Sequence, residues 1–132
     1  MNNINYLAVL VAAASSFLLG GLWYSPKLFG TAWNRENKST MNAGEGGHPA
    51  RVFGISFAWS FVAALTFAYL FGPAATLADA AMRGLLVGLC FVAASFGINY
   101  QFANRSNLMW LIDGGYHTLQ FVLFGSIIGM WH

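Results

Sequence analysis

The sequence predicts an all-α, polytopic membrane protein: a bundle of four transmembrane helices that forms a single domain over residues 1–132. Hydrophobic residues make up 58% of the chain and charged residues only 8%, a balance too apolar for a soluble domain of this length. Apolar runs of about 20 residues, the length that crosses a hydrocarbon layer of about 30 Å, recur along the chain. The few Lys and Arg residues form no basic face, so we expect no nucleic-acid partner.

The four spans are expected over residues 4–23, 52–71, 77–98 and 108–131. The first two contain no charged residue. In the third span, Asp79 lies one helical turn before Arg83, and the two side chains are expected to pair. Trp110 and Trp131 frame the fourth span, about 30 Å apart at a rise of about 1.5 Å per residue, so that one indole can reach each membrane interface.

The connection between the first two spans combines a short helix and a loop. Ser25 can cap a helix that has Pro26 at its first position, and we expect this helix to lie on the membrane surface. Residues 34–51 are polar and rich in glycine, which predicts a loop.

Basic residues indicate the orientation of the chain. Lys27, Arg35, Lys38 and Arg51 fall in the first connection and Arg105 in the third, whereas Arg83 alone lies near the second. The positive-inside rule therefore predicts that the first and third connections are cytoplasmic and that both termini lie on the non-cytoplasmic side.

Small residues recur at four-residue intervals in the predicted spans. In lipid, helices associate where small side chains let the backbones approach closely. This spacing favours a tight bundle, with a face that can also serve a second copy of the chain. The helix-packing candidates are Ala8, Ala12, Ser16, Gly20, Gly84, Gly88, Gly125 and Gly129.

Two stretches carry a resemblance to a known family. The first is residues 19–33, LGGLWYSPKLFGTAW; the second is residues 99–106, NYQFANRS, followed by LIDGGYH over residues 111–117 and the closing residues 125–131. The chain resembles the bacterial membrane family known as domain of unknown function 1761. The resemblance implies a multi-pass protein of the bacterial cytoplasmic (inner) membrane and implies no activity.

A polar stripe on the fourth span is the main candidate site. Asp113, Tyr116, His117 and Gln120 are spaced i, i+3, i+4 and i+7 and share one face of a helix. Ionisable residues inside a membrane are candidates for function, and Asp113 can accept a hydrogen bond from His117. Alternatively, the stripe packs inward and its hydrogen bonds fix the bundle. Arg105 is placed to meet Asp113.

Aromatic residues at the ends of spans are expected to anchor the protein at the membrane interfaces. These are Trp23, Tyr24, Trp33, Trp110 and Trp131. Contact of the first three with a pigment, quinone or lipid is the alternative. No nucleophile elbow, phosphate-binding loop, paired carboxylate or metal-ligand spacing occurs, so we expect no enzyme, no cofactor and no metal.

The predicted function is that of a non-catalytic membrane component that works by helix packing. Its expected partners are the lipid bilayer and either a second copy of itself, as a homo-oligomer, or other subunits of a larger membrane complex. A small transporter or channel-like protein that uses the polar stripe is the alternative.

Overall fold

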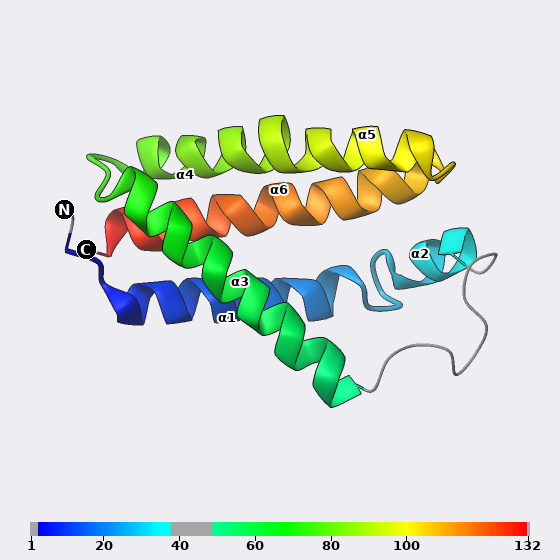
Figure 1. Cartoon of the computed structure of the whole chain (residues 1–132), viewed down its shortest axis with the longest axis horizontal. Helices are drawn as coiled ribbons and strands as arrows, with labels where there is room; N and C mark the ends of the chain where they lie inside the picture. Colours follow the sequence, from blue (N-terminus) through cyan, green and yellow to red (C-terminus); the bar gives the residue numbers. More distant parts are fainter. Residues whose placement is uncertain (1–2, 38–48, 132) are drawn as a thin grey trace.

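The structure, a computed structural model, describes residues 3–37 and 49–131, and these residues contain helices and no strand. The helices are, in chain order, α1 (Tyr6–Trp23), α2 (Gly30–Asn37), α3 (Pro49–Phe71), α4 (Leu77–Leu85), the π-helix η1 (Leu86–Ala93), α5 (Ala94–Phe102) and α6 (Asn107–Met130). The predicted all-α class is confirmed for this part of the chain. Because α4, η1 and α5 follow one another without a break, they make one long rod, as Figure 1 shows.

Three helical stretches in the described ranges are long and apolar enough to cross a membrane, where the sequence analysis expected four. They are Tyr6–Trp23, Ala50–Phe71 and Leu77–Phe102. The fourth expected span corresponds to α6, which has 24 residues and sufficient length. α6 is not among the three apolar stretches. It carries the polar side chains of Asp113, His117 and Gln120 along its length.

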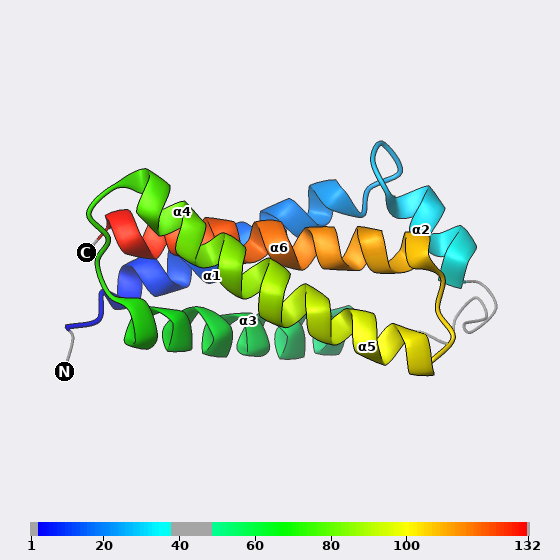
Figure 2. The same ribbon diagram turned by 90° about the horizontal axis from the view of Figure 1, so that it is seen from above.

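α6 lies at the centre of the molecule. It packs against α1, α2, α3 and every part of the α4–η1–α5 rod. Figures 1 and 2 show the rod along one side of α6, α1 along another, and α3 crossing obliquely over α1. The polar stripe of α6 is therefore surrounded by protein, and Asp113 and Gln120 are buried.

Both ends of the described chain lie at one end of the molecule, and α2 lies at the other (Figures 1 and 2). The Asn5 side chain donates a hydrogen bond to the carbonyl of Trp131 over 3.3 Å. The turn between α3 and α4 lies at the same end, where the Ala74 amide donates to the Gly129 carbonyl over 3.0 Å.

The apolar core lies where α1, α3 and α6 meet. Small alanines and two phenylalanines let the helices approach closely, and the Ser16 and Ser60 hydroxyls join α1 to α3 with a hydrogen bond of 2.9 Å. The core residues are Val9, Ala12, Ala13, Ala64, Phe67, Ala68, Phe124 and Ile128.

The short helix after the first span begins at Gly30, not at Pro26 as expected. The Ser25 hydroxyl donates to the carbonyl of Leu22 over 2.7 Å, so it completes the end of α1 and caps no new helix. Residues 25–29 form turns instead. A Cβ at Gly30 would lie 2.1 Å from the carbonyl oxygen of Tyr24, so only glycine lets the chain fold back this tightly.

The loop expected over residues 34–51 is helical at both ends. Residues 34–37 belong to α2 and residues 49–51 to α3. Residues 38–48 lie outside the described part of the chain.

Candidate functional site

The Asp113 carboxylate gathers hydrogen bonds from three separate segments. The Tyr24 hydroxyl donates to Oδ1 over 2.5 Å, and the Tyr100 hydroxyl donates to Oδ2 over 2.5 Å. The indole Nε1 of Trp33 donates to Oδ2 over 3.3 Å. Asp113 itself is only 7% exposed. Three donors aimed at two oxygens suit an ionised carboxylate, which can only accept hydrogen bonds.

Local structure positions each donor. Tyr24 is the residue directly after α1, and Trp33 lies in the middle of α2, which the tight turn at Gly30 folds back toward α6. Tyr100 is in the last turn of α5, whose chain reverses through Asn104 at a φ of +57° and then enters α6. Asn tolerates this left-handed conformation better than most residues. The site therefore joins four elements at the α2 end of the molecule.

Burial and the neighbouring Asp113 keep Tyr24 protonated. Burial and the hydrogen bond to the neighbouring Asp113 carboxylate raise the pKa of the Tyr24 phenol above its usual value of about 10. Its ring also lies edge-on to Trp33, with centroids 6.1 Å apart. Tyr24 is thus a permanent donor to Asp113 at every pH at which a cell lives.

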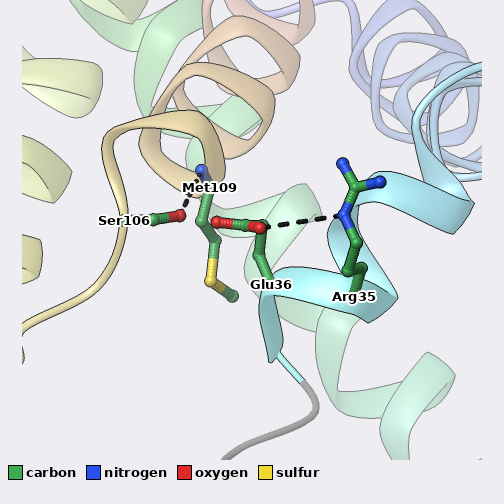
Figure 3. A network of polar contacts seen from close by, with 4 residues as sticks. All are labelled: Arg35, Glu36, Ser106 and Met109. Atoms are coloured by element: carbon green, nitrogen blue, oxygen red, sulfur yellow. Dashed lines mark hydrogen bonds and ion pairs between the residues drawn. The ribbon is translucent and has the colours of Figure 1, made fainter.

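The corner between α2 and α6 is closed by further polar contacts. Ser106 caps α6, because its hydroxyl accepts a hydrogen bond from the Met109 amide over 3.1 Å (Figure 3). In the same figure Glu36 of α2 pairs with Arg35 at 3.9 Å. The Arg105 guanidinium donates to the buried Asn37 side chain over 3.0 Å, which ties the end of α2 to the segment before α6.

The other members of the polar stripe bond elsewhere. His117 shares a hydrogen bond of 2.7 Å with Gln120 on its own helix, and its ring stacks on Phe96 with centroids 4.9 Å apart. Tyr116 donates to the carbonyl of Ser16 over 2.8 Å. Asp113 and His117 thus have separate sets of partners, although they lie one turn apart.

Four of the five expected interface anchors make contacts inside the protein through their polar atoms. Tyr24 and Trp33 bind Asp113, Trp23 Nε1 donates to the carbonyl of Ile112 over 2.9 Å, and Trp110 Nε1 donates to the carbonyl of Ala93 over 2.8 Å. Trp131, at the other end, is 42% exposed.

The helix-packing candidates lie against other helices of the same chain. Ala8, Ala12 and Ser16 are fully buried in α1. A Cβ at Gly84 would lie 2.0 Å from the Phe121 carbonyl oxygen, and one at Gly125 would lie 2.3 Å from that of Ala80. A Cβ at Gly88 would lie 2.8 Å from Thr118 Cα on α6, and one at Gly129 would lie 2.8 Å from Ala80 Cβ on α4. At Gly20 a Cβ would make only ordinary contact with the Tyr116 ring. Their closeness serves packing within the chain.

Arg83 binds backbone oxygens in place of the expected Asp79. Its Nη1 donates to the carbonyls of Phe71 and Pro73 over 3.1 Å and to that of Gly72 over 3.4 Å. These carbonyls lie at and just beyond the end of α3, where helical partners run out, so a guanidinium is well suited to them.

The polar residues of this region are linked to one another by hydrogen bonds. In the described part of the chain, no three His, Cys, Asp or Glu side chains come close enough to hold a metal ion. Buried polar side-chain atoms in the same ranges all have hydrogen-bond partners.

Spacing along the sequence did not identify the partners of Asp113. Tyr100 and Trp33 lie 13 and 80 residues away from it, and neither shares a helix with it. The signal that could have singled them out is chemical: a carboxylate near a membrane needs donors, and phenols and indoles are the donors available at helix ends.

Comparison with known families gives one result. Residues 7–129 match the family described as "Protein of unknown function (DUF1761)". No curated protein and no solved structure matches the chain.

Proposed function

The chain belongs to the DUF1761 family, and we propose that it is a non-catalytic component of the bacterial cytoplasmic membrane that acts through the fixed shape of its helices. In this proposal it crosses the membrane four times and works as a homo-oligomer or as a small accessory subunit of a larger complex. Three helices apolar and long enough to span a membrane support the membrane location.

One observation carries the proposal: the side chains of the polar stripe make their hydrogen bonds to other groups of the same chain. Asp113 has three donors, Tyr116 binds the Ser16 carbonyl, and His117 binds Gln120. A transport path needs polar groups that are free to exchange partners with an ion or a substrate. Groups that are already satisfied by fixed partners instead hold helices in one arrangement.

The position of α6 supports its assignment as the fourth span. Its polar side chains face α1, α2 and α5, so a membrane around the bundle would meet the apolar outer faces of the other helices. Both termini lie at one end of the molecule, as four crossings require. Lys27, Arg35 and Arg105 lie in the connections at the opposite end, which agrees with a cytoplasmic location of that end.

A transport assay separates this function from the alternative. The protein is reconstituted in proteoliposomes, and proton and cation flux is measured for the wild type, Asp113→Asn and His117→Ala. We expect no flux above that of empty liposomes for any of the three. Flux in the wild type that is lost in both variants would overturn the proposal in favour of a transporter.

A complementary measurement tests the assembly. Native mass spectrometry after gentle extraction reports copy number and foreign subunits together. We expect a homo-oligomer or a complex with another membrane protein, whereas a strictly monomeric protein without partners would contradict the proposed role.

A further inference from the structure

The outer face of the α4–η1–α5 rod carries two polar side chains that have no partner. Ser95 and Asn99 lie one helical turn apart on α5, and both are exposed. In the described part of the chain neither side chain makes a hydrogen bond. The half-buried hydroxyl of Ser15 and the exposed hydroxyl of Thr66, by contrast, each donate to a carbonyl of their own helix, at 2.7 and 2.8 Å.

Such a pair is costly on the surface of a spanning helix. α5 ends the apolar stretch Leu77–Phe102, and Ser95 lies about two turns inside its end. Lipid tails offer no hydrogen bonds, so unpaired hydroxyl and amide groups there favour contact with a polar partner. An amide donates and accepts equally well, as does a hydroxyl, so each group can pair with a copy of itself.

The residues around this pair form a packing seam. Phe91, Ser95 and Asn99 follow one another at intervals of four residues, the ridge along which two membrane helices pack in a right-handed pair. Phe91, Ile98 and Phe102 are 70%, 64% and 90% exposed. Beside the seam lies a shallow groove of about 400 Å³, lined by Phe91, Val92, Ser95, Phe96 and Asn99, which can receive a side chain from a neighbouring helix.

We propose that α5 is the contact between two copies of this chain, paired in parallel with Ser95 facing Ser95 and Asn99 facing Asn99. The membrane favours this arrangement, because a closed symmetric dimer of two copies inserted with the same topology has its twofold axis perpendicular to the bilayer. Equivalent residues then lie at the same depth, so each unpaired group meets its own counterpart. The small-residue ridges, by contrast, are used inside the chain and are not available to the second copy.

This inference rests on the proposed function, since it identifies the partner of a protein that works by helix packing. It names a second copy and no other protein, because the hydrogen-bonding groups on the face are self-complementary. The groove next to them is lined by the end of η1 and by α5, the part of the rod that carries the seam.

The first test is disulfide cross-linking in native membranes. In a Cys90→Ala background, which removes the chain's own cysteine, Ser95→Cys is compared with Thr66→Cys. Thr66 is the control because it is exposed on α3 and its hydroxyl already donates to the carbonyl of Val62 over 2.8 Å. We expect an oxidant to convert Ser95→Cys to a covalent dimer and to leave Thr66→Cys monomeric.

The second test measures association without cross-linking. Asn99→Leu removes both copies of the amide, and Thr66→Leu removes a hydroxyl that already has a partner in its own helix. By energy transfer between labelled copies in liposomes, we expect Asn99→Leu to weaken dimerisation by about threefold to tenfold or more and Thr66→Leu to leave it unchanged. Circular dichroism confirms that both variants keep their helix content.

The outcomes of these tests distinguish the α5 contact from the proposed helix-packing function on which it rests. A monomer, a dimer that cross-links through Thr66, or a complex with a foreign subunit in place of a second copy would overturn the α5 contact. The last two would leave the helix-packing function standing. Ion flux that depends on Asp113 and His117 would instead remove the function, whatever the cross-linking shows.

Discussion

Asp113 illustrates how a carboxylate is accommodated between apolar helices. Its carboxylate is nearly excluded from solvent, yet both oxygens are hydrogen-bonded to phenol or indole groups. Hydrogen bonds to a charged group contribute about 1.5–3 kcal/mol each, more than those between neutral groups. Tyr24, Trp33 and Tyr100 also come from three separate segments, so the stability they contribute fixes the relative positions of α1, α2 and α5.

Tyr24→Phe removes one of these hydrogen bonds without changing the size of the ring. We expect the free energy of unfolding in detergent to fall by about 1.5–3 kcal/mol, because one donor to a buried carboxylate is lost. Unfolding is followed by the tryptophan fluorescence of Trp23 and Trp33, which lie nearby. Tyr69→Phe is the control, since Tyr69 is 57% exposed on α3 and should contribute nothing. Equal stability of the two variants would contradict a stabilising role for the Tyr24–Asp113 bond.

The raised pKa of Tyr24 gives the same bond a defined pH dependence. A group with a raised pKa in the folded protein contributes stability that is complete below its unfolded pKa, about 10, and is lost as the pH rises through the folded value. The stability difference between wild type and Tyr24→Phe should therefore stay constant from about pH 7 to 9 and narrow only above about pH 10. A difference that does not narrow above about pH 10 would show that burial and Asp113 do not raise the pKa of the Tyr24 phenol.

At the scale of elements, the contact between the α4–η1–α5 rod and α6 depends on glycine and on one indole. Gly84 and Gly125 bring the two backbones together at distances that no side chain allows. At the end of the π-helix η1, the indole of Trp110 on α6 donates a hydrogen bond to the carbonyl of Ala93, the last residue of η1. The Trp110 indole also packs against Gly97 and Gly114, so the ring fills the space that two missing side chains leave.

Gly84→Ala tests the backbone contact. Its methyl group would lie 2.0 Å from the carbonyl oxygen of Phe121, so the helices must separate, and we expect a loss of stability of about 1–3 kcal/mol or more. The matched control is Gly54→Ala on α3, where a Cβ meets nothing within 4 Å. There alanine should be neutral or stabilise by up to about 1 kcal/mol through its higher helix propensity. Thermal unfolding of both variants measures the contrast, and a harmless Gly84→Ala would refute the close packing of α4 on α6.

Trp110→Phe tests the hydrogen bond from the Trp110 indole to the carbonyl of Ala93 in the π-helix η1. The substitution keeps an aromatic ring but leaves the Ala93 oxygen without its indole donor, so we expect unfolding to be easier by about 1–3 kcal/mol. Trp59→Phe serves as the reference, because Trp59 is 69% exposed on α3. If the two substitutions lowered the free energy of unfolding equally, Trp110 would be acting only as an apolar surface residue.

At the scale of the whole molecule, the position of the termini makes the topology testable. With four crossings both termini share one side, whereas three crossings would place them on opposite sides. A reporter fused after Asn104 lies at the α2 end, and one fused after His132 lies beyond α6. We expect alkaline phosphatase to be active only after His132 and green fluorescent protein to fluoresce only after Asn104, in line with the positive-inside rule. The opposite pattern would reverse the orientation, and the same side for both would mean that α6 does not cross.

Composition and hydropathy predict the all-α class of this protein and its long apolar helices. Apolar runs of sufficient length and a low content of charge indicate membrane helices, because these properties follow from the thickness of a bilayer and need no partner. The small residues at four-residue intervals also predicted a tight bundle, and Gly84 and Gly125 lie against the backbone of other helices in the chain. The residues 19–33 and 99–117 carried the family resemblance, which the match over residues 7–129 confirms.

The polar groups that meet in the fold could not be predicted from helical spacing. Periodicity relates residues on one helix, so it suggested Asp113 with His117 and Asp79 with Arg83, both one turn apart. The folded chain pairs Asp113 with Tyr24, Trp33 and Tyr100 and pairs Arg83 with the carbonyls that end α3. The physical reason is that a buried charge takes the donors or acceptors that its surroundings leave unsatisfied, and those are set by how distant segments pack.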